Sequence, residues 1–278
     1  MRQSYITYVV GFVSLLIPTC LLATPEVIVT ILYDNYMSQE GLQTDWGFAC
    51  LVEGLDKTIL FDTGARGATL LDNVNKLAVD LNDVDVIVIS HDHQDHYGGL
   101  NTFLKRNHEV DVYLLENFSE ERANTVQRHG AKVVTVQGPR QICKGAWLTG
   151  PMGTQIVEQS LVLDTVEGVV VITGCAHPGI VSIVKKAQAM VTKPIHLVLG
   201  GFHLLNHSDK GIQERIAAFQ DLGVQHAGPT HCSGRKTIEL FEQAYGDKFI
   251  EFGVGKRLSL PLSERKAVYP HLKQKEIQ

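Results

Sequence analysis

Residues 84–100 read VDVIVISHDHQDHYGGL, and this stretch is the most informative part of the sequence for the fold and the site. Its apolar first part, residues 84–89, predicts a buried β-strand. Three histidines and two aspartates follow within the six positions from His91 to His96. Imidazole nitrogens and carboxylate oxygens are ligands of zinc, and they also suit iron or manganese. The stretch therefore predicts a strand that ends in a divalent transition-metal site.

The spacing of these side chains favours two metal ions rather than one. At the end of a strand, side chains two positions apart point to the same side, so His91 and His93 can reach one ion. The turn that follows carries Asp95 and His96 to an adjacent position, where they can reach a second ion. Two such ions can share a hydroxide and lower its pKa. A polar loop whose histidines only cap a helix is the alternative, but packing does not explain so many ligand-type side chains after a buried strand.

Length and composition favour one large domain. The 278 residues, of which 44% are hydrophobic, can bury a sizeable core, and we find no linker and no internal repeat. We expect the catalytic domain to span residues 24–278. The net charge of −5 provides no basic surface for nucleic acid, so we expect a small-molecule substrate. The sequence does not determine the oligomeric state.

The N-terminus resembles an export signal. Arg2 precedes the nearly uncharged stretch 5–22, which ends near Ala23. We therefore predict a signal peptide over residues 1–23 and a periplasmic or secreted protein, with a retained N-terminal membrane anchor as the alternative. Export would permit two disulfides among the remaining cysteines, although two of them lie beside histidines and are candidates for the metal site. These cysteines are Cys50, Cys143, Cys175 and Cys232.

The order of elements predicts the fold class. Apolar and β-branched runs predict strands at 27–33, 48–53, 57–62, 84–89, 111–115, 131–136, 159–164, 168–173 and 195–199. Helical spacing predicts helices at 68–77, 100–106, 119–129, 180–190 and 211–222. Strands come first and strand–helix alternation follows, twice. This order predicts an α/β protein with a four-layer αββα sandwich, two sheets packed together and helices outside.

Residues 90–100 resemble the signature of the metallo-β-lactamase-fold hydrolases. Asp62-Thr63-Gly64 matches an earlier aspartate motif of that superfamily, which implies that Asp62 supports the site through hydrogen bonds. Residues 174–179 (GCAHPG), 200–204 (GGFHL) and 229–234 (PTHCSG) resemble one branch more closely. That branch carries the name 7,8-dihydropterin-6-yl-methyl-4-(β-D-ribofuranosyl)aminobenzene 5′-phosphate synthase.

The resemblance implies a ligand set with one gap. It assigns His91 and His93 to the first metal, and Asp95, His96 and His231 to the second. Relatives usually supply a third first-metal histidine from an intervening loop, and the corresponding residues 147–153 contain none. We expect His177, just past a strand end, to fill the gap, with His203 as second choice. Each of these two could instead bind substrate or shuttle a proton.

Cys175 stands where many relatives have an aspartate that bridges both metals. As a thiolate it would be a soft ligand for zinc, and as a neutral thiol it would leave the second site weaker. We expect one or two Zn²⁺ ions, with Mn²⁺ or Fe²⁺ as alternatives. Asp95, His177 and His203 are the residues we expect to take part in catalysis. Arg66, and Arg235 with Lys236, are candidates for holding an anion.

The resemblance implies a metal-dependent hydrolase that uses a metal-activated hydroxide. Phosphate esters or diesters lead as substrates because the branch is named for a phosphorylated compound. Lactones, thioesters and β-lactams are alternatives within the same class. A di-iron redox protein and an inactive metal-binding sensor are alternatives outside it. The predicted export does not suit a pterin pathway, so we take the fold and the metal site from the resemblance and leave its substrate open.

Overall fold

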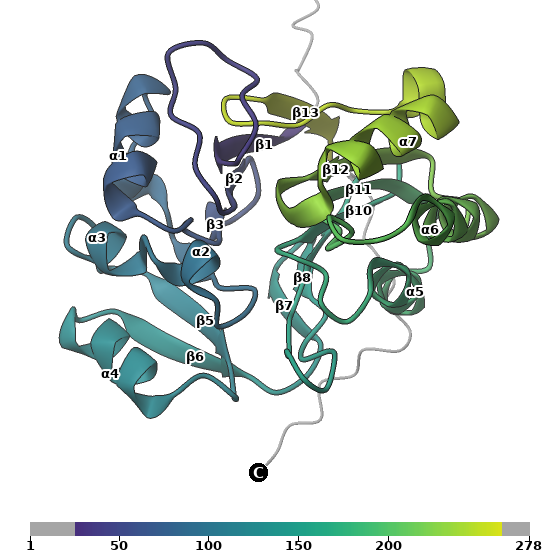
Figure 1. Ribbon diagram of the computed structural model, residues 1–278. Helices are drawn as coiled ribbons and strands as arrows, with labels where there is room; N and C mark the ends of the chain where they lie inside the picture. The colour runs from purple at the N-terminus through teal and green to yellow at the C-terminus, as the bar shows by residue number, and fades with distance from the viewer. Residues whose placement is uncertain (1–25, 263–278) are drawn as a thin grey trace, which may run out of the picture.

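The computed structural model describes residues 26–262 of the chain. Two β-sheets pack face to face, and helices cover the outer face of each sheet (Figure 1). This is the predicted four-layer αββα sandwich, and that prediction is confirmed. The predicted signal segment 1–23 lies outside the described residues. Between residues 26 and 262, no helix is long and apolar enough to cross a membrane.

The first sheet has seven strands in the order β13-β1-β2-β3-β4-β5-β6. The strands β3 to β6 run parallel to one another, and β13, β1 and β2 pair antiparallel. On its outer side lie α1 (Gly67–Lys76), α3 (Leu100–Leu104) and α4 (Glu120–Arg128). The strands are β1 (Glu26–Tyr33), β2 (Ala49–Glu53), β3 (Ile59–Phe61), β4 (Val86–Val88), β5 (Asp111–Leu115), β6 (Lys132–Val136) and β13 (Arg257–Pro261).

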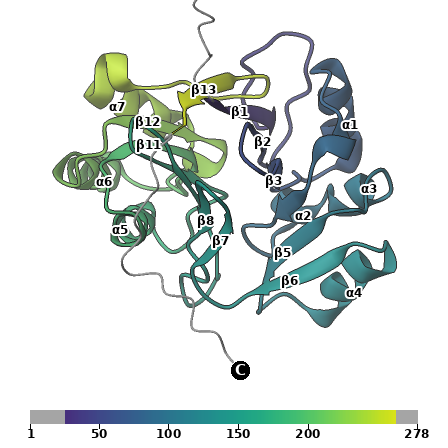
Figure 2. The ribbon, with the colours of Figure 1, turned by 180° about the vertical axis from the view of Figure 1, so that it is seen from behind.

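The second sheet has six strands in the order β12-β11-β10-β9-β8-β7. Here β10, β11 and β12 are parallel, while β7 to β10 pair antiparallel. Figure 2 shows from behind how α5 (Ile180–Met190), α6 (Asp209–Asp221) and α7 (Arg235–Tyr245) cover this sheet. The strands are β7 (Arg140–Cys143), β8 (Ala146–Leu148), β9 (Leu161–Asp164), β10 (Val169–Thr173), β11 (Ile195–Gly201) and β12 (His226–Thr230).

The core explains why the central strands are apolar along their whole length. Every residue of β4 and of β10 is fully buried, because each strand has a sheet on one side and a helical layer on the other. Phe202, Phe219 and Phe241 form a second cluster of rings under the helices, with centroids 5.4–5.5 Å apart. This packing provides a rigid support for the loops that follow the parallel strands.

Some elements were not expected from the sequence. Trp147 and Leu148, predicted to lie in a loop, belong to β8, so that prediction is wrong for these two residues. The reason is long-range pairing: Gly145 adopts a positive φ of 85°, which closes a tight turn between β7 and β8, and Trp147 pairs with Val162 of β9. The strand β12 was not predicted from the sequence, because it contains a glycine and a proline, which are uncommon in strands. It lies at the sheet edge, where proline is tolerated.

Candidate metal centre

Loops from both sheets meet at one end of the sandwich. The first sheet contributes the segment after β4, including the short helix α2 (Gln94–Tyr97). The second sheet contributes the loops after β10 and β11 and a single 3₁₀ turn after β12, His231–Ser233. Because the carboxyl ends of parallel strands lie at one edge of each sheet, these loops can converge. They form three overlapping groups of metal-ligand side chains, and two of these groups share no residue.

The first donor set consists of His91, His93 and His177, whose ligand atoms lie within 4.8 Å of one another. Nε2 of His91 is 3.0 Å from Nδ1 of His93. Nε2 of His177 is buried and has no hydrogen-bond partner among the described residues. A buried polar nitrogen without a partner is costly, and a metal ion would satisfy it. His177, our first choice for the missing third ligand, thus lies where the first metal would need it.

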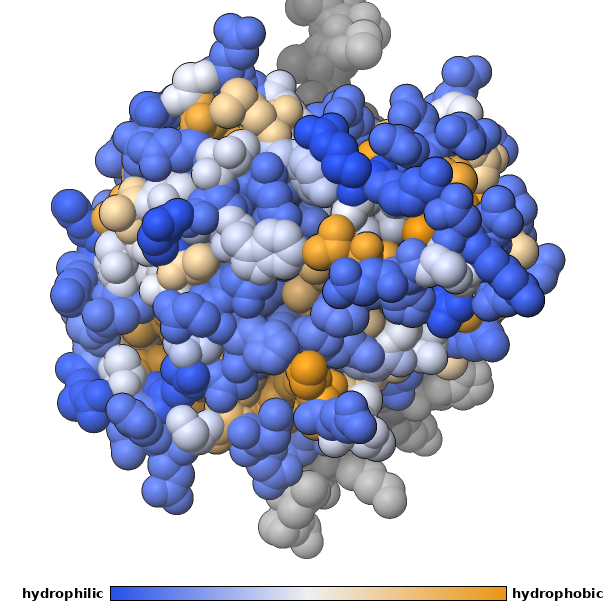
Figure 3. Space-filling model, viewed as in Figure 1, coloured by the Kyte–Doolittle hydropathy of each residue, from blue (hydrophilic) through white to orange (hydrophobic). Residues whose placement is uncertain are grey.

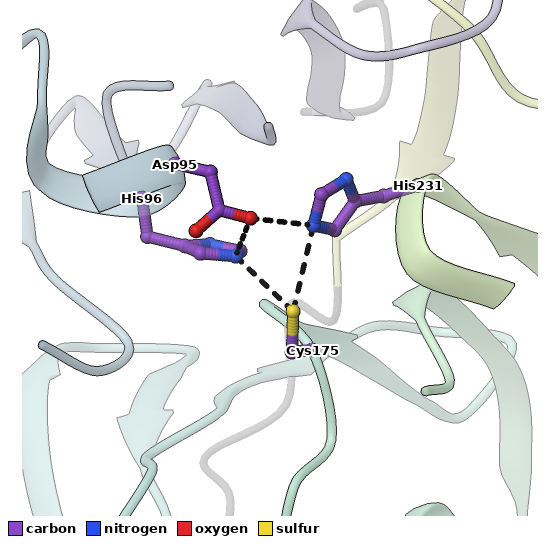
Figure 4. A group of neighbouring side chains, drawn as sticks. All are labelled: Asp95, His96, Cys175 and His231. Atoms are coloured by element: carbon purple, nitrogen blue, oxygen red, sulfur yellow. Dashed lines mark hydrogen bonds and ion pairs between the residues drawn. The ribbon is translucent and has the colours of Figure 1, made fainter. Parts of the chain in front are cut away.

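The second donor set consists of Asp95, His96, Cys175 and His231, again within 4.8 Å of one another (Figure 4). Sγ of Cys175 is 3.2 Å from Nε2 of His96 and 3.4 Å from Nε2 of His231. Oδ2 of Asp95 lies 3.5 Å and 3.3 Å from the same two nitrogens. Two imidazoles, a carboxylate and a thiol that face a common point suit Zn²⁺. The site residues therefore fit the metal, while their coordination to it stays a prediction.

Asp62 supports the site as predicted, and it also selects which imidazole nitrogens face inward. Its carboxylate accepts hydrogen bonds of 2.7 Å from the Ser90 backbone N–H, from the Ser90 hydroxyl and from Nδ1 of His96. Nδ1 of His91 donates in turn to Ser90 Oγ at 2.9 Å. Both histidines then donate through Nδ1, which leaves Nε2 as the nitrogen directed at the donor sets. Gly174 is required here, because a Cβ would lie 2.2 Å from Ser90 Oγ.

Asn35 performs the same task for His231, and the sequence reasoning missed it. Oδ1 of Asn35 accepts from Nδ1 of His231, and Nδ2 of Asn35 donates to the His231 carbonyl, both at 3.0 Å. The two residues are 196 positions apart in the chain. The signal that could have identified Asn35 is its place in a polar pair, Asp34-Asn35, directly after the buried strand β1.

Glu158 is a second residue that the sequence reasoning missed. Its buried carboxylate accepts hydrogen bonds of 2.8–2.9 Å from the backbone N–H groups of Cys175, Ala176 and His177. This clamp holds Ala176 in the left-handed region, with a φ of 63°. It also turns Cys175 toward one donor set and His177 toward the other. Burial raises the pKa of Glu158 although the three N–H donors oppose the shift.

The electrostatic settings of the two donor sets differ. Burial lowers the pKa of His91 strongly and that of His177 to about 3, with neighbouring imidazoles adding to both shifts. These histidines are neutral at pH 7, which is the form that binds metal. For Asp95, burial alone would raise the pKa, but hydrogen bonds to His231 and His96 hold it well below its usual range. Burial also opposes ionisation of His96, yet the Asp62 carboxylate raises its pKa to about 10.

His203 lies beside the metal centre. Its ring centroid is 4.2 Å from that of His177, and the residue is exposed with a φ of 55°. It is grouped with Cys175 and His177, and the neighbouring side chain of Cys232 raises the pKa of His203. Cys232 also donates to the carbonyl of Cys175 at 3.6 Å. All four cysteines in the described part of the chain are free, so the two disulfides that export would permit are not formed.

Comparison with known proteins tests the predicted family resemblance. The Metallo-beta-lactamase superfamily matches residues 47–215. A solved structure, Tm1679, described as a metal-dependent hydrolase of the beta-lactamase superfamily, is 31% identical and superposes with a TM-score of 0.72, covering 84% of this chain and 98% of that one. The 7,8-dihydropterin-6-methyl-4-(beta-D-ribofuranosyl)-aminobenzene-5'-phosphate synthase of Methanocaldococcus jannaschii is 28% identical over 271 residues, 81% of this chain and 92% of that protein. The predicted resemblance is thereby confirmed.

Proposed function

Because this chain belongs to the metallo-β-lactamase superfamily, we propose that it is a metal-dependent hydrolase of phosphate esters or diesters. The observation that carries the proposal is that two complete donor sets adjoin. The rings of His91 and His96, one from each set, have centroids 4.2 Å apart. Cys175 and His177, again one from each set, are held by the same carboxylate. Two ions bound there would activate a water molecule and polarise the bond to be cleaved.

The residues of this chain have separate tasks in such a reaction. Asp62, Asn35 and Glu158 hold the ligands in position through the hydrogen bonds described above. Asp95 is partly exposed, with 18% of its side chain accessible, so it lies where the metal centre meets solvent. His203 is exposed beside His177 and is the residue we expect to contact the substrate or exchange a proton with the leaving group.

The donor types favour zinc. A thiol in the second set suits Zn²⁺ better than it suits a di-iron pair, which argues against the redox alternative. Mn²⁺ remains the alternative for a set of imidazoles and a carboxylate. Metal analysis of the purified protein distinguishes these ions, and an iron content of two per chain would contradict the preference for zinc.

The phosphate preference rests on the relative's name and not on the charges around the site. That relative is named for making a compound that carries a 5'-phosphate. Of the cations considered from the sequence, Arg66 is paired with Asp45, and Lys236 is paired with Asp209 at 3.3 Å. Arg235 stacks over the ring of Tyr36 at 5.2 Å. Because the relative is named as a synthase, hydrolysis has to be tested directly.

A substrate screen tests the proposal. The purified protein, loaded with Zn²⁺ or Mn²⁺, is assayed on bis-p-nitrophenyl phosphate, an acyl-homoserine lactone and nitrocefin. We expect turnover of the phosphodiester, and loss of that turnover in His93→Ala and Asp95→Ala. Turnover of the lactone or of nitrocefin alone would show that the substrate is not a phosphodiester. No turnover of any of the three would overturn the hydrolase proposal.

We also propose that residues 1–23 direct export, so that the protein acts in the periplasm or outside the cell. The support is the charge and hydropathy pattern of that segment. Cell fractionation followed by N-terminal sequencing tests this proposal. Recovery of a chain that begins near Thr24 outside the cytoplasm is expected, and an uncleaved chain in the membrane fraction would show the anchor instead.

A further inference from the structure

Trp46 is an exposed aromatic residue beside the metal centre. Its relative accessible surface is 47%, and its ring centroid lies 5.1 Å from that of His231. The three other large hydrophobic residues of comparable exposure in the described part of the chain are aliphatic: Met37, Val166 and Leu205. On the face shown in Figure 3, hydrophobic residues form only small, separate patches. An exposed indole beside a candidate metal centre offers a face on which an aromatic ring of a ligand can stack.

The indole is presented by a braced loop. The backbone N–H of Trp46 donates to Oδ1 of Asp45 at 2.8 Å. The other carboxylate oxygen of Asp45 accepts from the Tyr33 hydroxyl and from Nε of Arg66. These bonds connect the loop after β1 to the segment after β3. The bonds fix the backbone that carries the indole, so less of this loop has to be ordered when a ligand binds.

The same loop is packed directly against the second donor set. Gly47 has a φ of 145°, and a Cβ there would lie 2.5 Å from the carbonyl oxygen of Asp95. The backbone N–H of Phe48 donates to that oxygen at 3.3 Å. Only glycine permits this approach, so Gly47 fixes the distance between the indole and the metal centre. A group stacked on Trp46 is therefore adjacent to whatever binds at Asp95.

An open pocket of about 450 Å³ contains both Trp46 and Asp95 in its lining. It is lined by Asp45, Trp46, Ala65, Arg66, Gln94 and Asp95. Its volume is in the range of small-molecule sites. The charges of the lining are two carboxylates and one guanidinium, and the guanidinium is already paired with Asp45. The pocket as a whole does not attract an anion, so Arg66 is better placed to contact an uncharged group than to hold a phosphate.

We propose that this pocket binds an aromatic group of the substrate, stacked on Trp46, while the attached phosphoryl group reaches the metal centre. The inference rests on the proposed function for the identity of the second group. Indole and guanidinium faces both stack on planar rings, whereas an aliphatic group would gain only burial. The pocket therefore selects aryl or heteroaryl phosphate esters over alkyl ones.

Binding of two small phosphonates to the zinc-loaded full chain tests the proposal. Phenylphosphonate and methylphosphonate carry the same headgroup and differ only in the ring. Isothermal titration calorimetry should give an affinity for phenylphosphonate about ten-fold higher, which is the size expected for one ring stacked on an aromatic side chain. Phenylphosphonate should also quench the emission of Trp46. The other tryptophan, Trp147, is buried and unchanged in every variant below.

Three variants sharpen the test. Trp46→Ala should bring the two phosphonates to equal affinity, and Trp46→Phe should keep part of the preference for the phenyl compound. Val166→Ala is the control, because Val166 is 58% exposed on the turn between β9 and β10 and lines none of this pocket. Equal affinities in the unmodified protein, no binding of phenylphosphonate, or an intact preference in Trp46→Ala would each overturn the proposal.

Failure of the pocket and failure of the proposed reaction give different results. A phenyl preference that depends on Trp46, together with no hydrolysis of any phosphodiester, would support the binding pocket and contradict the proposed hydrolase activity. Equal rates of bis-p-nitrophenyl phosphate hydrolysis in Trp46→Ala and the unmodified protein, with no phenyl preference in binding, would support the hydrolase activity and contradict the binding pocket.

Discussion

The two donor sets of the metal centre differ in charge. The first consists of three imidazoles, from His91, His93 and His177, whereas the second joins two imidazoles to the carboxylate of Asp95 and the thiol of Cys175. Imidazoles bring no charge to a divalent ion, while a carboxylate and a thiolate bring two. We therefore expect the second set to bind zinc more tightly, and we expect damage to the two sets to produce different losses.

The two sets also differ in how the chain assembles them. Two of the three first-set ligands lie in one short segment after β4. The second set draws Asp95 and His96 from that segment and Cys175 and His231 from two loops of the other sheet. The first set thus needs one residue from the other sheet, whereas the second needs two residues from two different loops.

Removal of one ligand from each set should give the largest effect. Cys175→Ala removes one of four donors, and we expect zinc affinity at the second position to fall about a hundred-fold or more. In the cobalt-substituted protein, the sulfur-to-cobalt absorption band should disappear. His177→Ala, the matched variant, should weaken the first position and leave the band in place. Loss of the band in His177→Ala would show that the two sets do not act separately.

Glu158→Gln should weaken both sets together. An amide can accept hydrogen bonds through one atom only, so at least one of the N–H groups of residues 175–177 is left facing an NH₂ group. Loss of such a support typically costs about 10–100-fold in metal affinity. Competition with a chromophoric chelator measures it. Glu167→Gln is the control, because Glu167 is an exposed carboxylate that pairs with His196 away from the site. An effect on only one metal would contradict the shared clamp.

The sequence predicted the residues that are adjacent in the chain better than those that only folding brings together. The ligand-rich segment after β4 could be predicted because its residues are adjacent in the chain and follow a buried strand. Glu158 and Asn35 could not, because each acts on a segment that only the folding of the sheets brings near it, across 196 positions in the case of Asn35. The pairing of β12 with β11 likewise stabilises a strand that its own residues do not favour.

A weak chelator should remove the two metals in order. The first set carries no anionic ligand, so its ion should leave first, at a chelator concentration about ten-fold lower than that needed for the second. Metal content measured after each step should pass through one ion per chain, and the thermal midpoint should fall in two steps because each bound ion stabilises only the folded state. Simultaneous loss of both ions would break the expected difference between the sets.

Arg122→Ala should give the smallest effect, confined to the first set. The guanidinium of Arg122, on α4, lies 3.6 Å from the ring centroid of Tyr97 and pairs with Asp92, the residue between the two histidines of that set. The pair is partly exposed, so its loss together with the stacking should cost roughly 1 kcal/mol in the free energy of unfolding. Urea unfolding measures this cost.

Arg128→Ala, on the same helix, is the control, since Arg128 bonds only to Thr125 among the described residues. Because Asp92 borders His91 and His93 but not Cys175 or His231, we expect the cobalt–sulfur band to remain while binding at the imidazole set weakens a few-fold. A change in that band would mean that the helix on the first sheet also governs the donors of the second.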